Sequence, residues 1–240
     1  MTAASALRTV ASEVVVVERA PVFAPLGAGI VLAANAVSAL RSLGIDPTPQ
    51  GRVLGAFEVR TAEGGLGSAV RPEDVSPGRP AIGIHRAALH EVLLGAVRGC
   101  ADLRPGRSIA GLDDRGDAVE VELDDGSRER FDLVIGADGL HSAPRARLGG
   151  PSPVYSGYTC WRAVVDGDGD TAREWWGRGR RFGAVPLPGG RTYVFLTRNA
   201  LAGGSAAIED FAAMFGGFEA PVRELAHRID PAAVLHHCPR

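Results

Sequence analysis

Two acidic side chains stand at the ends of apolar runs, where a buried strand would present them to a ligand. Glu18 closes the β-branched stretch EVVVVER (residues 13–19), and Asp138 follows the run Leu133-Val134-Ile135 in DLVIGADGLHSAPR. In a doubly wound sheet, ligands bind at the carboxyl ends of strands, and an acid there accepts hydrogen bonds from ribose hydroxyls. Glu18 suits that role, and an ordinary solvated glutamate at a strand end is the equal alternative.

Small residues surround Asp138 and leave room for a bulky neighbour. Gly136 and Gly139 keep the chain thin on both sides, Ser142 is placed to cap a short helix, and Arg145 follows about one turn later. In one interpretation Asp138 orients a ligand or a backbone N–H, while Arg145 faces phosphate or pairs locally. In the other, Asp138 is a structural turn residue and Arg145 a surface cation.

Composition removes several other chemistries. All 26 basic residues are arginine, which excludes Schiff-base and Walker lysines, and the net charge of −2 gives no electrostatic case for nucleic acid or an anionic membrane. No apolar run approaches the roughly 20 residues that cross a bilayer.

The three cysteines are far apart, which favours reduced thiols in a cytoplasmic protein. His236 and His237 lack a third ligand, so no metal site is predicted.

The pattern of elements predicts an α/β fold. A helix-like start precedes the strand at 13–19, and helical spacing recurs at 33–43 and in HRAALHEVLLGAV. Further strands are expected at 109–112, 118–123 and Leu133–Ile135, and a pair of strands around a Gly-Gly turn within 51–70. A meander with all three Trp and all three Tyr occupies 155–198, two helical segments follow at 206–215 and 221–228, and LHHCPR shows no terminal element.

Several stretches together resemble the FAD-dependent aromatic hydroxylases of the p-hydroxybenzoate hydroxylase type. DLVIGADGLHSAPR is similar to the Asp-Gly motif of that family with its downstream Ser-x-x-Arg, and EVVVVERA to its ribose-binding strand. LGAGIVLAANAVSALRSLGI, IHRAALHEVLL, YSGYTCWRAVV and RRFGAVPLPGGRTYVF follow in the family's order. The resemblance covers nearly the whole chain.

The resemblance implies a partial FAD-binding Rossmann-like, three-layer domain with an inserted, mainly antiparallel substrate sheet. The FAD-binding domain would span 1–150, with 52–70 joining the substrate sheet of 151–204. Helices at 205–240 would then lead back toward the FAD domain.

The resemblance also implies roles for single residues. Glu18 would bind the FAD ribose with Arg19 beside it, and Arg86 would contact the ribityl-pyrophosphate region. Asp138 and Gly139 would help to hold the pyrophosphate, and Ile109 stands where a strand backbone meets adenine. No side chain is assigned as a catalytic acid or base.

The sequence departs from the family at both ends. Its N-terminal Gly-x-Gly-x-x-Gly is missing, because Gly27-Ala28-Gly29 comes after the acid, and so is the C-terminal Gly-Asp segment. The implied activity is hydroxylation of a small, aromatic substrate with NAD(P)H and O₂. The alternatives are a truncated, non-catalytic remnant with weak or no FAD binding, and a related flavin reductase or dehydrogenase. The sequence does not indicate an oligomeric state.

Overall fold

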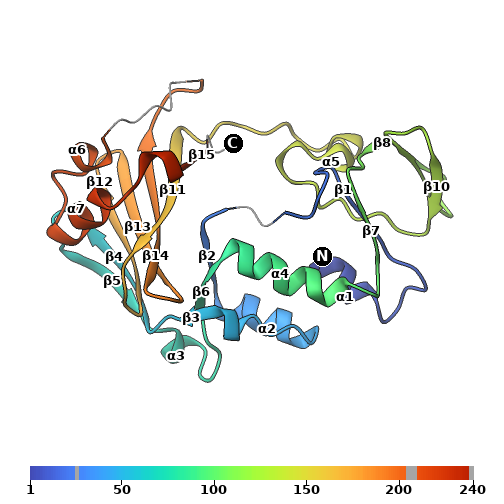
Figure 1. Cartoon of the computed structure of the whole chain (residues 1–240). Helices are drawn as coiled ribbons and strands as arrows, with labels where there is room; N and C mark the ends of the chain where they lie inside the picture. The colour runs from blue at the N-terminus through green and yellow to red at the C-terminus, as the bar shows by residue number, and fades with distance from the viewer. Residues whose placement is uncertain (25–26, 204–209, 238–240) are drawn as a thin grey trace. The chain divides into compact units, whose positions relative to one another are not determined.

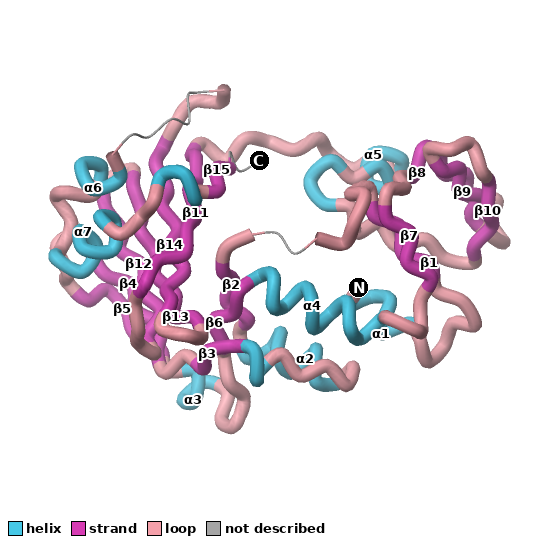
Figure 2. The backbone as a smooth tube through the Cα atoms, in the orientation of Figure 1, coloured by secondary structure: helices cyan, strands magenta, loops and turns pink. Residues whose placement is uncertain are grey.

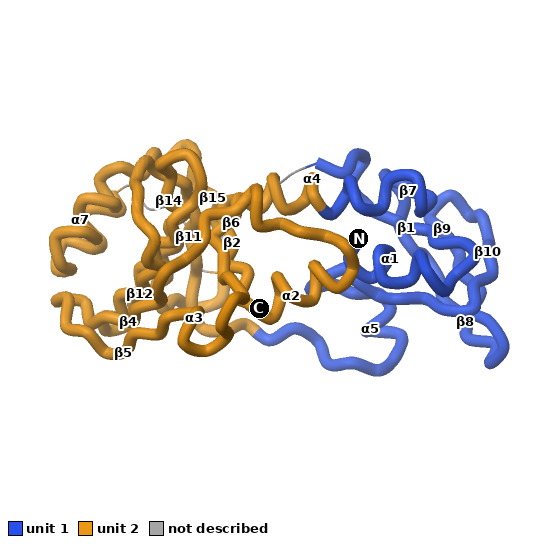
Figure 3. The backbone as a smooth tube through the Cα atoms, turned by 90° about the horizontal axis from the view of Figure 1, so that it is seen from below, with its two compact units in different colours: residues 1–24, 93–154, 240 blue, residues 25–92, 155–239 orange. Residues whose placement is uncertain are grey.

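The structure is a computed structural model, and it describes residues 1–24, 27–203 and 210–237. The chain divides into two compact units that interleave along the sequence (Figure 3). Unit 1 comprises residues 1–24 and 93–154, and unit 2 comprises the described residues of 25–92 and 155–239. The chain is a mixed α/β protein with several sheets, as the sequence predicts. The predicted domain ranges stay a prediction.

Unit 1 contains a short parallel sheet packed against two helices. β1 (Val15–Glu18) pairs in parallel with β7 (Asp102–Pro105). The apolar sides of α1 (Thr2–Leu7) and of the end of α4 (Arg86–Val97) supply its core. The buried residues of that core are Ala4, Leu94 and Val97.

A second sheet of unit 1 is antiparallel throughout. β8 (Ile109–Asp114), β9 (Val119–Leu123) and β10 (Arg128–Phe131) follow one another in space as in sequence. Alternation in β9 buries Val121 and Leu123, which confirms the predicted pair of strands. The short α5 (Ala143–Arg147) comes after them.

Two predictions for unit 1 are wrong. Leu133–Ile135 forms no strand, and Leu133 and Ile135 are 62% and 49% exposed. An extended segment becomes a strand only when a neighbour takes up its backbone N–H and C=O groups, and none does so within the described chain. The second wrong prediction is a fully buried strand at 13–19, because β1 is only half-buried. β7 is the one strand that pairs with it among the described residues.

Unit 2 is built on a seven-stranded sheet in the order β15-β11-β14-β13-β12-β4-β5 (Figures 1 and 2). The predicted meander forms four long antiparallel strands, and β4 joins β12 in parallel. β4 and β5 form a hairpin around Gly64-Gly65, where Gly64 has a φ of +95°. The strands are β4 (Ala56–Thr61), β5 (Leu66–Val70), β11 (Tyr158–Asp166), β12 (Thr171–Gly177), β13 (Arg180–Leu187), β14 (Arg191–Asn199) and β15 (Leu235–His237).

One face of this sheet carries the largest core of unit 2. α6 (Phe211–Met214) and α7 (Ala220–His227) lie on that face in Figure 1 and cover it with aromatic and aliphatic side chains. Edge-to-face ring pairs link Trp175, Phe182, Phe215 and Phe218 in series. The side chains that β11, β13 and β14 bury in this core are Trp161, Ala163, Val165, Phe182, Ala184, Val194 and Leu196.

A smaller three-stranded sheet packs on part of the other face. β2 (Gly29–Leu32), β6 (Ile82–His85) and β3 (Gly51–Val53) pair antiparallel, and α2 (Ala34–Ser42) follows β2. The two sheets approach so closely at Gly83 that a Cβ there would lie 2.1 Å from the Pro186 carbonyl oxygen. The apolar residues between them are Ala28, Leu54, Ala172, Val185, Leu187 and Tyr193.

The C-terminal part differs from the sequence prediction. Leu235–His237 forms the edge strand β15, which pairs with β11, where no element was predicted. α6 is shorter than the predicted 206–215, and residues 206–209 of that range lie outside the described residues. The remaining elements are α3 (Pro72–Val75) and the 3-10 turns Thr48–Gln50, Gly139–His141 and Pro231–Ala233. In the described part of the chain, each helix is too short or too polar to cross a membrane.

We expect Leu196→Ala to lower the free energy of unfolding by about 2–5 kcal/mol, because Leu196 is fully buried in the main core of unit 2. Leu201→Ala is the matched control, since Leu201 is 88% exposed, and it is expected to change stability by less than about 0.5 kcal/mol. Urea unfolding measures both. Equal losses for the two variants would contradict the assigned core.

Candidate functional site

Glu18 ends β1 with its side chain exposed at the carboxyl end of the strand. Its Oε1 accepts a hydrogen bond from the Ala20 N–H at 2.8 Å, and its backbone carbonyl accepts one from the Arg107 N–H at 3.0 Å. The carboxylate thus has one oxygen fixed by the turn and keeps acceptor capacity on the other. Arg19, the next residue, is also exposed.

Asp138 binds the start of the helix that follows it. Its Oδ2 accepts a hydrogen bond from the Ala143 N–H at 2.8 Å, and Ser142 Oγ caps α5 by accepting the Arg145 N–H at 3.1 Å. The predicted Ser142 cap is confirmed. Partial burial raises the pKa of Asp138, but hydrogen bonds from Ser142 and Ala143 and the Arg145 charge outweigh it, so that the pKa lies below its ordinary value.

Gly139 and Ile109 are expected to contribute through their backbone, because neither has a polar side chain. Gly139 has a φ of +81°, which favours glycine, directly after Asp138. Ile109 begins β8 opposite Leu123, at an irregularity of the ladder between Ile109 and Gly111. Unit 1 therefore contains five of the six predicted cofactor residues, although no hydrogen bond or ion pair joins Glu18 to Asp138 within the described chain.

Arg86, the sixth, belongs to unit 2 and begins α4 directly after β6. Its N–H donates to the Ala28 carbonyl at 2.8 Å, and its side chain crosses Gly27, where a Cβ would lie 3.0 Å from Arg86 Cδ. Gly27 has a φ of +111°, so both its conformation and its surroundings require glycine. No carboxylate pairs with the Arg86 guanidinium in the described part of the chain. A free cation thus lies against a glycine backbone.

Sequence reasoning missed the partner of this glycine loop. Tyr193 of β14 is 7% exposed, and a Cβ on Gly29 would lie 2.4 Å from Tyr193 Cβ. Burial raises the pKa of Tyr193 above its ordinary value, against the opposing charges of Arg162 and Arg86. The only available signal was the alternation of the meander, which does not by itself show which face of a strand meets a ligand.

Further aromatic and basic side chains share the face of the sheet that bears Tyr193. Phe195 lies 5.9 Å from Tyr193, ring centroid to centroid. The Arg181 guanidinium lies 5.5 Å from the Tyr158 ring centroid and 6.0 Å from that of Trp176, within cation–π range. This face, which we call the aromatic–arginine face, consists of Tyr158, Arg162, Trp176, Arg181, Tyr193 and Phe195.

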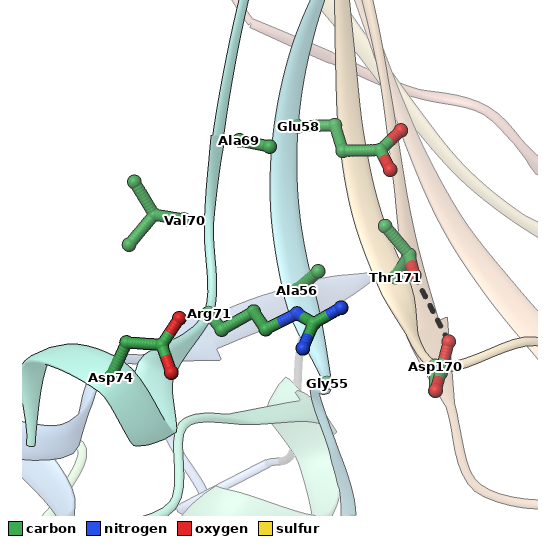
Figure 4. A pocket seen from close by; sticks show the side chains of 9 residues that line it. All are labelled: Gly55, Ala56, Glu58, Ala69, Val70, Arg71, Asp74, Asp170 and Thr171. Atoms are coloured by element: carbon green, nitrogen blue, oxygen red, sulfur yellow. Dashed lines mark hydrogen bonds between the residues drawn. The ribbon is translucent and has the colours of Figure 1, made fainter.

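A separate open groove lies at the start of β4 and β12 (Figure 4). Arg71 and Asp74 point into it from one side, and Asp170, hydrogen-bonded to Thr171 Oγ1 at 3.0 Å, from the other. Glu58 is already held by Arg60 and Arg173 at 2.9 Å each, and these arginines keep its pKa below the ordinary value. The groove contains none of the predicted ligand residues, and we assign no function to it.

Comparison with known proteins identifies relatives along most of the sequence. The chain is 37% identical, over 98% of its length, to the aurachin C monooxygenase/isomerase of Stigmatella aurantiaca. It is 33% identical, over 94% of its length, to the 3-amino-4-hydroxybenzoate 2-monooxygenase of Streptomyces cremeus. It spans 64% and 61% of these two proteins, less than two thirds of either. No family model matches the sequence.

Solved structures share the fold. The Klebsiella pneumoniae HpxO structure with FAD and uric acid matches with a TM-score of 0.84 and 28% identity, over 99% of this chain and 64% of that one. The 2-methyl-3-hydroxypyridine-5-carboxylic acid oxygenase matches with a TM-score of 0.79 and 22% identity, over 98% of this chain and 66% of that one.

We expect Gly29→Ala to destabilise the protein by about 1–3 kcal/mol, because the new Cβ overlaps the Tyr193 side chain. Gly95→Ala is the control: it lies inside α4 with nothing within 4 Å of a new Cβ, and alanine is expected to stabilise the helix by about 0.5–1 kcal/mol. Thermal and urea unfolding report both changes. A neutral Gly29→Ala variant would mean that Tyr193 does not pack on the loop.

The Asp138 carboxyl is expected to titrate below the ordinary value of about 3.9. Its contribution to stability is then complete above that ordinary value and disappears as the pH falls through the lowered pKa. Ser142→Ala removes a donor to the carboxylate and is expected to shift the midpoint upward in a carboxyl NMR titration. Asp125, whose pKa is lowered by hydrogen bonds from Ser127, serves as the control and is expected to keep its midpoint in that variant. An unchanged Asp138 midpoint would contradict the hydrogen bond from Ser142.

Proposed function

We propose that this chain, whose homologues are FAD-dependent aromatic hydroxylases and monooxygenases, binds FAD and takes part in the NAD(P)H- and O₂-dependent hydroxylation of an aromatic substrate. The observation that carries the proposal is the unpaired Arg86 guanidinium above Gly27. Arg86 is exposed, so the donors of its guanidinium are open to the oxygens of an anionic cofactor. No observation favours a non-catalytic remnant over this function.

The residues present fit FAD in both units. In unit 1, Glu18 retains acceptor capacity at the end of a parallel strand, which suits the ribose hydroxyls, and Arg19, Ile109, Asp138 and Gly139 are proposed to complete the nucleotide part. Asp138 is proposed to act indirectly, because its carboxylate already fixes the start of α5 and so orders the backbone around Gly139.

In unit 2, Arg86 is proposed to bind the phosphate or ribityl oxygens. Gly27 has no side chain to block that approach, and its φ of +111° is one that glycine adopts readily. The Arg86 N–H, fixed to the Ala28 carbonyl, holds the start of α4 against the loop. Charge-assisted hydrogen bonds from a guanidinium fork to phosphate are among the stronger polar contacts in proteins.

FAD, when bound, supplies the redox chemistry: NAD(P)H reduces it, and O₂ then provides one oxygen atom to the substrate and one to water. The chain's own residues bind the cofactor, orient the substrate and exclude water from the site. Tyr193 and Phe195 offer ring faces for an aromatic substrate, and the packing of Tyr193 on Gly29 keeps water out between sheet and loop. No titratable side chain of the described residues is assigned a proton-transfer step.

The substrate is proposed to be a small aromatic compound, as 3-amino-4-hydroxybenzoate is in the name of one relative. A cytoplasmic location is proposed as well, since Cys100 and Cys160, the two described cysteines, are both free thiols.

The full chain is expected to bind FAD, as measured by quenching of flavin fluorescence during titration. Arg86→Gln is expected to weaken binding about 10-fold or more, because a charge-assisted hydrogen bond is worth about 1.5–3 kcal/mol. Arg191→Gln, which removes an exposed arginine of the same unit, is the control and is expected to bind as the wild type does. A chain indifferent to FAD would contradict the proposed function.

Activity is tested by oxidation of NADPH in the presence of FAD, candidate hydroxybenzoates and ¹⁸O₂. One labelled oxygen in the aromatic product and one in water is the expected result. NADPH oxidation without label in any product would instead indicate a reductase.

A further inference from the structure

The turn that follows β1 in unit 1 is held from one side by the segment that follows β7. The Gly106 N–H donates to the Ala20 carbonyl at 2.7 Å, and the Arg107 N–H donates to the Glu18 carbonyl at 3.0 Å. Among the described residues, β7 is also the one strand that pairs with β1. The position of the Glu18 carboxylate therefore depends on where residues 106–107 lie.

The same segment is bound on its other side to the turn between β9 and β10. The Arg107 guanidinium lies 2.8 Å from Asp125 Oδ2 and 3.9 Å from Asp124 Oδ1. Ser108 donates to Asp124 Oδ2 from its N–H at 3.2 Å and from its Oγ at 2.9 Å. The Asp124 N–H donates in return to the Ser108 carbonyl at 3.0 Å. Residues 106–108 thus bridge two turns that lie far apart in the sequence.

The turn between β9 and β10 is a fixed anchor for the Arg107 side chain. Asp125 Oδ1 accepts hydrogen bonds from the Ser127 N–H at 3.0 Å and from Ser127 Oγ at 2.6 Å, while Oδ2 meets the guanidinium. The hydrogen bonds from Ser127 and the Arg107 charge keep the pKa of Asp125 below its ordinary value, so the carboxylate is ionised at neutral pH. Val121 and Leu123, both buried in β9, hold the hairpin that carries this turn.

Arg115 offers a comparison within the same three-stranded sheet. Its guanidinium lies 2.9 Å from Asp113 and 3.0 Å from Glu120, at the turn between β8 and β9, so it joins two neighbouring strands of one sheet. The Arg107 and Arg115 side chains are 43% and 54% exposed, so the two ion pairs are of one kind. They differ in that Arg107 also donates its N–H to the strand end that bears Glu18.

We propose that Arg107 is a positioning residue for the adenosine part of the cofactor, because its ion pair with Asp125 fixes the strand end on which Glu18 meets the ribose. This inference rests on the proposed function, in which Glu18 binds the ribose hydroxyls, and adds a residue that acts without touching the ligand. An acceptor that is held in place before binding loses less conformational freedom when the ligand arrives, and the ligand therefore binds more tightly.

The test is a double-mutant cycle between Glu18 and Arg107, in which quenching of flavin fluorescence measures the FAD affinity of the full chain. We expect Arg107→Gln to weaken binding about 3- to 5-fold, and Arg107→Lys to stay within about 2-fold of the wild type because lysine keeps the charge. Glu18→Ala is expected to weaken binding about 5- to 10-fold by removing the ribose acceptor. In the Glu18→Ala background, Arg107→Gln is expected to weaken binding by less than about 1.5-fold further, because the group that it positions is gone.

Arg115→Gln is the matched control, because it breaks an ion pair of similar exposure in the same sheet, and it is expected to keep the wild-type affinity for FAD. Urea unfolding without FAD measures the stability of each variant, and Arg107→Gln and Arg115→Gln are expected to lose similar amounts. Wild-type affinity in Arg107→Gln, an equal loss of affinity in Arg115→Gln, or losses from Glu18→Ala and Arg107→Gln that add in full would overturn the assignment.

Failure of the proposed function gives a different result. A wild-type chain that binds FAD but shows an additive cycle contradicts the role of Arg107 alone. A wild-type chain that does not bind FAD contradicts the proposed function and, with it, the role of Arg107.

Discussion

The proposed site in unit 2 depends on the close approach of a glycine loop to two side chains. Gly27 lies under Arg86 and Gly29 under Tyr193, and a Cβ at either position would lie 3.0 Å or less from the neighbouring side chain. Glycine at these two positions leaves room for the Arg86 side chain at one and the Tyr193 ring at the other. Tyr193 also belongs to the apolar cluster between the two sheets, so a side chain at Gly29 would disturb that packing.

The two arginines of the aromatic–arginine face, Arg162 and Arg181, have no carboxylate partner among the described residues. Elsewhere in unit 2, arginines are paired: Arg60 and Arg173 share Glu58, and Arg191 bonds to Asp166. On the aromatic–arginine face, by contrast, the cations meet rings and a phenol. Burying charge in this way lowers stability, and it is consistent with a surface that has evolved to receive anions rather than to hold the fold together.

The sequence predicted the elements with strong local patterns and missed those that depend on partners. Helix α4 and strands β9, β11 and β14 follow from periodicity, since their apolar spacing decides the type of element. Leu133–Ile135 has the composition of a strand but no ladder forms on it within the described chain, and β15 has no strand-like pattern yet pairs with β11. Glu18, Asp138 and Arg86 were identified by motif, whereas Tyr193 required knowledge of which strand face is covered.

A crystal structure of the full chain grown with FAD tests the central claim most directly. We predict that the Arg86 guanidinium lies at hydrogen-bond distance, about 2.7–3.2 Å, from an oxygen of the cofactor while Tyr193 remains packed on Gly29. FAD bound elsewhere, or an Arg86 side chain turned away from the glycine loop to pair with a protein carboxylate, would contradict it.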